Sequence, residues 1–181
     1  MEVFRLEFNI ESLVNTDDWM LLRRLMEVES INVDAAENGE YIPAISLRGG
    51  GGHSYLINYP MTKIDGDEYP QITLISNIKH SYKWENVFSG RVKKIAVVRD
   101  EVTWKSGGDT WIVNQDSGIK IYFDKIQILI MAIDSIGGLI KYLVADSFPT
   151  EVSKEELQNY WSFKTDALVM AIRKEIDIYD I

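Results

Sequence analysis

The chain has 181 residues, no cysteine and a formal net charge of −9. Because 46% of the residues are apolar and 26% are charged, we expect one folded domain and exclude a disordered chain. The missing cysteines exclude disulfides and thiolate chemistry, and they favour a reducing, cytoplasmic location.

Charge is distributed unevenly along the sequence. Residues 1–40 carry ten acids against three bases, whereas residues 79–105 carry seven Lys or Arg against three acids. The acidic surplus argues against nucleic acid as the main partner, because phosphate binding requires a positive field. It is compatible with a basic protein partner or simply with solubility.

The first 123 residues are expected to be rich in strands. Residues 3–10 alternate between apolar and polar, which is typical of a half-buried strand. A helix is expected from Asn15 or Thr16 to about Glu29, since either residue is a suitable N-cap. Further strands are expected at residues 31–33, 42–47, 55–58, 71–78, 92–99, 110–114 and 119–123. The last two flank residues 115–118, which we interpret as a hairpin connection with Gly118 in the left-handed conformation.

The apolar segment of residues 125–145 is predicted to be one long, mostly buried helix. Its apolar residues share a broad helical face, and Gln127, Asp134 and Lys141 form a narrow polar stripe opposite. Asp124 and Gln127 have the spacing of a capping box. The alternative is a β-hairpin that turns at residues 135–138, because Ile and Val prefer strands.

A second capping box, Ser153 with Glu156, predicts a last helix that extends to about Ile176. The order of elements therefore predicts a single α+β domain. Residues 1–123 would form a mostly antiparallel sheet with one helix, and residues 124–181 would form a helical segment packed on that sheet.

The four-glycine run between Arg48 and His53 is the most unusual local feature. Its functional interpretation is a loop that binds an anion or small ligand, with donors from Arg48, Gly50, Gly51, His53 and the basic, aromatic segment around His80. Its structural interpretation is a flexible hairpin connection. The sequence shows no histidine at a metal-ligand spacing and no nucleophile motif, so we predict no metal, no cofactor and no catalytic residue.

We therefore expect a small acidic protein-binding module, such as an inhibitor or immunity-type antagonist, in preference to an enzyme. Acidic residues near the N-terminus would steer association and tryptophans would anchor the interface. The predicted partner-binding residues are Asp17, Asp18, Glu27, Glu29, Trp84, Trp104 and Trp111. The alternatives are a ligand-binding protein or enzyme that uses the glycine loop, and a subunit of a homo-oligomeric assembly; no membrane partner is expected.

Overall fold

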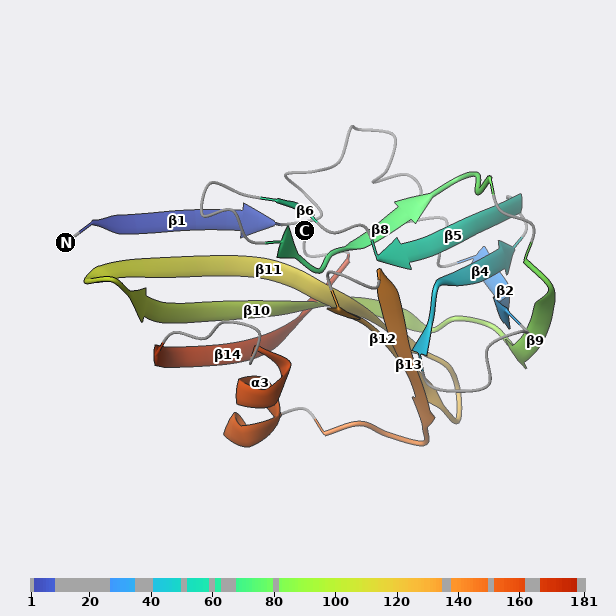
Figure 1. Ribbon diagram of the computed structural model, residues 1–181. Helices are drawn as coiled ribbons and strands as arrows, with labels where there is room; N and C mark the ends of the chain where they lie inside the picture. The colour runs from blue at the N-terminus through green and yellow to red at the C-terminus, as the bar shows by residue number, and fades with distance from the viewer. Residues whose placement is uncertain are drawn as a thin grey trace.

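The computed structural model describes residues 2–8, 27–34, 41–49, 52–58, 61–62, 68–79, 82–134, 138–149, 152–161 and 167–178. These residues form fourteen strands and one helix (Figure 1). Most of the strands belong to two sheets of seven and five strands, and β6 (Met61–Thr62) and β7 (Glu68–Tyr69) form a separate small pair. The described part of the chain is therefore mostly β, which corrects the predicted helix-rich α+β fold.

The seven-stranded sheet is built around two long strands, β10 (Lys94–Ser106) and β11 (Asp109–Tyr122), which pair along their whole length. The first half of β11 also pairs in parallel with β1 (Val3–Phe8), and its second half pairs with β12 (Gln127–Asp134). Beyond β12 lie β13 (Leu139–Ala145) and β3 (Tyr41–Ile42), and β14 (Ala167–Asp177) lies on the other side of β10.

The five-stranded sheet has the order β8-β5-β4-β2-β9. Its strands are β2 (Val28–Asp34), β4 (Ala44–Gly49), β5 (Gly52–Asn58), β8 (Ile72–Ile75) and β9 (Trp84–Ser89). The main hydrophobic core joins the two sheets, because it contains side chains from both, including Ile45 and Leu56 from one and Ile95, Ile121 and Ile130 from the other. Each strand of the five-stranded sheet therefore has a second face that points away from the core.

The predicted central helix at residues 125–145 is wrong, and the hairpin that we kept as the alternative is present. β12 and β13 pair antiparallel with Ile128 opposite Val144, and Gly138 has the positive φ of +62° that a turn requires. Both faces of β12 are covered: Ile128 and Ile130 lie in the core, and Leu129 faces a pocket on the other side. A strand buried on both faces loses the alternating pattern, so helical periodicity appeared by coincidence.

The C-terminal prediction is correct only at its start. Ser153 caps α3 (Lys154–Tyr160), with the Glu156 backbone N–H donating to Ser153 Oγ at 3.1 Å. The helix ends after seven residues, and the chain returns as strand β14. No helix in the described ranges has the length and apolar character needed to cross a bilayer.

The predicted connection at residues 115–118 is also wrong, because these residues lie inside β11. β11 instead forms a hairpin with β10, and the turn of this hairpin is at Gly107 and Gly108, both of which have positive φ. Residues 115–118 instead form a β-bulge: Val98 pairs with Gly118 and Arg99 pairs with Asp116, which leaves Ser117 as the extra residue. A Cβ at Gly118 would lie 2.3 Å from the Ile130 carbonyl oxygen, so close strand approach explains this glycine. The predicted N-terminal helix lies mostly outside the described residues, and its last two residues belong to β2.

Candidate binding surface

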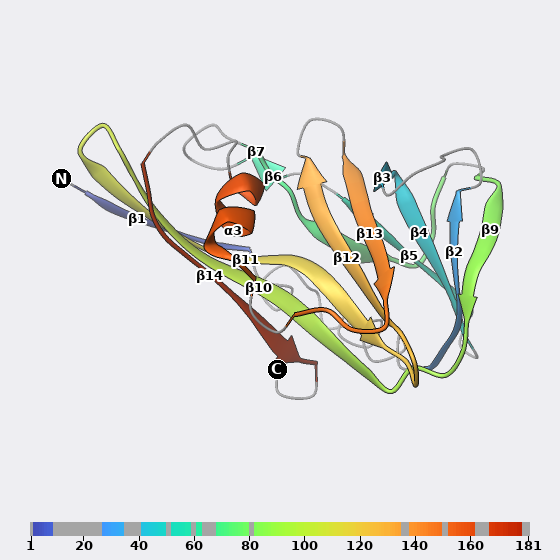
Figure 2. The ribbon, with the colours of Figure 1, turned by 90° about the horizontal axis from the view of Figure 1, so that it is seen from below.

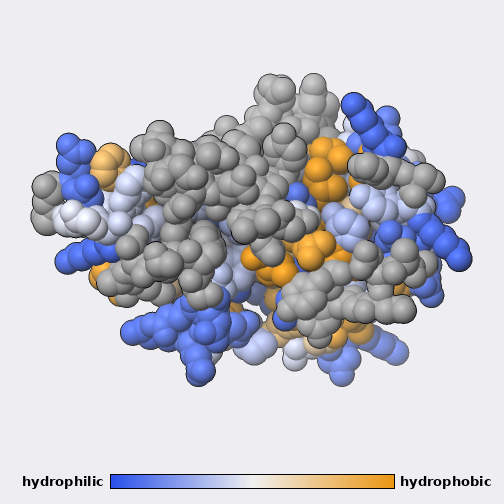
Figure 3. All heavy atoms as spheres, viewed as in Figure 1, coloured by the Kyte–Doolittle hydropathy of each residue, from blue (hydrophilic) through white to orange (hydrophobic). Residues whose placement is uncertain are grey.

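The face of the five-stranded sheet that points away from the core carries mixed aromatic and polar side chains. Strand register defines this face: Arg48 lies opposite His53, Ser46 lies opposite Tyr55 and Asn32, and Asn32 lies opposite Asn86. These residues alternate with the core residues Leu47, Leu56 and Ile31. We call this surface the outer face, and Figure 3 shows hydrophilic residues gathering at the end of the molecule where β5 and β9 lie.

Aromatic rings cross the outer face from one side to the other. The Tyr55 ring on β5 lies 5.7 Å from the Trp84 ring on β9, although β4 and β2 separate these strands. Three strand spacings amount to about 14 Å, so the two side chains lean toward each other over β4 and β2. His53 stacks on Tyr55 at 6.3 Å and Tyr82 contacts Trp84 at 5.1 Å. The four rings form a continuous row, which we call the aromatic arch.

A group of hydrogen-bonded polar side chains lies on the outer face beside the aromatic arch, around Asn86 on the same strand as Trp84. The Asn86 amide nitrogen donates to Asn32 Oδ1 at 3.2 Å and to the Phe88 carbonyl at 3.1 Å, and Ser89 Oγ donates to Asn86 Oδ1 at 3.1 Å. Ser46 is buried although it lies on the outer face, as expected for a residue below the arch. Several hydrogen bonds to one side chain hold it in place, so the Asn86 amide has a fixed orientation on the outer face.

Asp34 lies opposite Trp84 on the neighbouring strand and close to Tyr82. This carboxylate is buried and accepts a hydrogen bond from the Lys83 backbone N–H at 3.3 Å. Burial, and then the nearby negative charge of Asp34, raise the pKa of the Tyr82 hydroxyl. Both effects favour the neutral hydroxyl of Tyr82 over the phenolate.

The glycine run links β4 to β5, as a hairpin connection would. Gly49 pairs with Gly52, which has a φ of +116°, and Arg48 pairs with His53. The structure thus brings together two predicted ligand-binding residues, both exposed, at the margin of the aromatic arch. Gly50, Gly51 and His80 lie outside the described residues.

The structure separates the three predicted interface tryptophans. Trp84 belongs to the aromatic arch, whereas Trp104 and Trp111 face each other across β10 and β11 in the other sheet, with stacked rings 6.3 Å apart. Trp104 is only 2% exposed, and Trp111 is half-buried and stacks on Phe4 at 4.2 Å. These two residues therefore pack the far end of the long hairpin.

Of the predicted acidic residues, Glu27 and Glu29 are exposed at the start of β2, next to the outer face. Glu29 is the extra residue where Val28 pairs with Gly49 and Ser30 pairs with Arg48. Asp17 and Asp18 lie outside the described residues. No group of His, Asp or Glu within the described ranges has the arrangement of a metal site.

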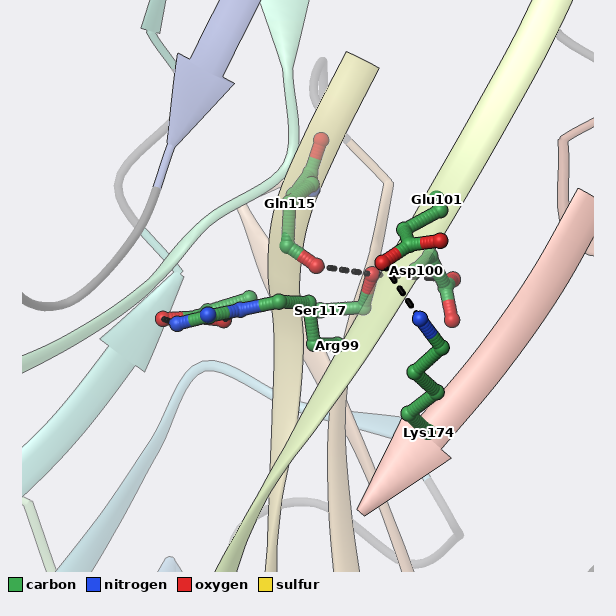
Figure 4. Close-up of polar contacts among 7 residues, drawn as sticks. Arg99, Asp100, Glu101, Gln115, Ser117 and Lys174 are labelled. Carbon is green, nitrogen blue, oxygen red and sulfur yellow. Dashed lines mark hydrogen bonds and ion pairs between the residues drawn. The ribbon is translucent and has the colours of Figure 1, made fainter. Parts of the chain in front are cut away.

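A second polar group, missed by the sequence analysis, is buried at the β11 bulge (Figure 4). Asp100 is fully buried and accepts two hydrogen bonds from Arg173, at 2.7 and 2.8 Å. It also accepts bonds from Ser117 Oγ at 2.9 Å and from Trp161 Nε1 at 3.0 Å. Beside it, Arg99 forms a second bidentate pair with the buried Asp116. These satisfied pairs tie β10, β11, β14 and the end of α3 together.

No local pattern marks Asp100 or Tyr55 as special in the sequence. Arg173, the partner of Asp100, is 73 residues away, and Trp84, the partner of Tyr55, lies across two intervening strands. The three consecutive charged residues 99–101 inside the otherwise mostly apolar segment 95–104 were the available signal for the buried pair. Comparison with protein-family models, with curated proteins and with solved structures finds no match for this chain, so its function is argued from its geometry alone.

Proposed function

We propose that this protein is a recognition module that binds another protein through the outer face of its five-stranded sheet. The observation that supports the proposal is the aromatic arch, made by His53, Tyr55, Tyr82 and Trp84. Half-buried Tyr and Trp supply a large contact area at a small entropic cost, since their positions are already fixed.

The chemistry of the outer face favours a protein over other partners. Tyr, Trp and Arg are enriched in protein–protein interfaces, and Tyr, Ser and Asn are enriched in antibody binding sites, with aromatic anchors at the centre and polar groups around them. A net charge of −9 opposes binding to nucleic acid along a basic track. Arg48 and His53 then serve as polar contacts at the margin of this surface.

The specific form of the proposal is an inhibitor or immunity-type antagonist, which acts by occupying the surface of a basic partner. The exposed acids Glu27 and Glu29 adjoin the outer face, where they would attract such a partner during encounter. Contacts in the aromatic arch would then determine the dissociation rate.

Affinity capture with matched variants tests this proposal. The tagged protein is incubated with nuclease-treated lysate of its source organism, beside the double variant Arg48→Glu, His53→Glu and the control Lys105→Glu, which changes an exposed lysine at the far end of β10. We expect one protein to be recovered near stoichiometrically by the wild type and the control and to be lost with the double variant. Equal recovery by all three would contradict the proposal.

A further inference from the structure

A pocket of about 90 Å³ lies on the seven-stranded sheet, on the side away from the main core. Its floor is formed by Val98, Leu129 and Leu143 from three strands, and its wall by Phe148, Pro149 and Val152 from the connection between β13 and α3. Figure 2 shows this connection and α3 crossing the sheet. The pocket is on a different sheet from the aromatic arch, so it is independent of the proposed recognition surface.

Lys120 is a buried cation in this otherwise apolar lining. Its side chain is only 3% exposed, and its ammonium donates to Glu175 Oε1 at 2.7 Å. An ammonium has three N–H donors, and Glu175 is its one acceptor among the described residues. The Phe148 and Tyr122 rings, at 5.6 and 5.1 Å, provide cation–π contacts but no acceptor oxygen.

Arg173 provides further donors at the same pocket. Its side chain is 9% exposed, and two of its N–H groups bind Asp100, while its guanidinium lies 4.8 Å from the centre of the Tyr160 ring. A guanidinium has five N–H donors, so three remain beyond the Asp100 pair in the described part of the chain. These remaining N–H groups can donate to an acceptor that enters the pocket without breaking the Asp100 pair.

The charges around the pocket cancel in pairs. Lys120 is paired with Glu175, Arg173 with Asp100, and Lys174 with Glu101, while Glu156 is exposed to solvent. Tyr122 also donates to Glu175. The excess is therefore in N–H donors and not in net charge, so an oxygen acceptor is the complementary group.

We propose that this pocket binds a small aliphatic carbonyl compound, whose oxygen accepts hydrogen bonds from Lys120 and Arg173 and whose chain packs on Leu129, Leu143 and Phe148. A 150 Å³ apolar cavity holds benzene, so by proportion this one holds about four non-hydrogen atoms. Carboxylates and amides share the carbonyl oxygen, so acetate and acetamide, with four non-hydrogen atoms each, are the probes, and ethylamine is the matched compound that lacks an acceptor.

Ligand-observed NMR on the full chain, with the Trp161 indole N–H as a second reporter, tests the proposal. That N–H donates to Asp100 beside Arg173, so occupancy of the pocket should shift its resonance. We expect acetate or acetamide to bind with roughly millimolar affinity and ethylamine not to bind. Binding by acetate alone would show that the ligand needs a negative charge, and binding by both would show that the carbonyl oxygen is sufficient; either result supports the site.

Two variants distinguish the pocket from non-specific binding. Lys120→Met removes the donor and should weaken binding about tenfold, and Leu143→Phe should abolish it by filling the floor. Val144→Phe is the matched control, because Val144 is exposed on the same strand and does not line the pocket. The proposal is overturned if neither carbonyl compound binds, if ethylamine binds equally well, or if a folded Leu143→Phe variant binds like the control.

Discussion

Replacing Asp100 by asparagine should destabilise the protein by about 3–5 kcal/mol, because it leaves the buried Arg173 cation without a counter-charge. Asp100 is fully buried and accepts four hydrogen bonds, two of them from Arg173. Asparagine has nearly the same shape, so the change removes the charge and one acceptor oxygen and leaves the packing almost unaltered. The expected loss is a large fraction of the 5–15 kcal/mol that typically stabilises a domain.

Urea unfolding followed by tryptophan fluorescence measures this loss. With an m-value of about 2 kcal/mol/M, a loss of about 4 kcal/mol moves the midpoint by about 2 M. The neighbouring change Glu101→Gln is the matched control. Its partner Lys174 is half-exposed, and an exposed ion pair contributes at most about 1 kcal/mol.

The double variant Asp100→Asn, Arg173→Met tests whether the loss of stability comes from the unpaired Arg173 charge. It removes both charges and keeps an acceptor for Ser117 and Trp161, so it should be more stable than Asp100→Asn alone. The reasoning is refuted if Asp100→Asn costs no more than Glu101→Gln, or if the effects of the two changes simply add.

Three further predictions follow from the close strand approach, the buried hydroxyls and the acidic residues. Gly118→Ala should lower the unfolding midpoint in urea, since its Cβ would meet the Ile130 carbonyl oxygen at 2.3 Å; an unchanged midpoint would contradict the approach of β12 to β11. Burial raises the pKa of Tyr122 and of Tyr160 above 10. The unfolded state therefore loses these protons first, and stability should fall above pH 10. The fall should be up to about 1.4 kcal/mol per pH unit for the buried hydroxyl of Tyr160 and smaller for that of Tyr122, which solvent screens. Unfolding curves at pH 9 to 11 test this, and the corresponding Phe variants should flatten the decline. Charge reversal of four acidic residues together should slow association with a captured partner and reduce the salt dependence of the association rate. These residues are Asp17, Asp18, Glu27 and Glu29. An unchanged association rate would exclude electrostatic steering by them.

Some of the fold could be predicted from the sequence because it is encoded locally. Residues 3–8 alternate cleanly and form β1, and Ser153 caps a helix because its hydroxyl reaches the Glu156 N–H three residues later. The Ile-rich segment 125–145 could not be assigned by its pattern, since the main core covers one face of its strands and the pocket covers the other. The charged residues of β14 were assigned to a helix because their partners on β10 are far away in sequence.

The binding surface was predictable only in part. The glycine run indicated that Arg48 and His53 belong together, and their cross-strand pairing is a local consequence of the hairpin. The contact of Tyr55 with Trp84 depends instead on the strand order β5-β4-β2-β9, which joins segments 29 residues apart through two intervening strands. Burial of Trp104 depends in the same way on the distant segments of the second core cluster, including Tyr69 and Trp161.

The central claim is that the aromatic arch contacts the partner, and tryptophan side-chain NMR tests it most directly. Each indole N–H gives one resonance, and Trp84 and Trp111 report on different sheets. When the captured partner is added, we predict a large shift or loss of the Trp84 signal and an unchanged Trp111 signal. A perturbed Trp111 beside an unchanged Trp84 would place the interface on the long hairpin and contradict the account.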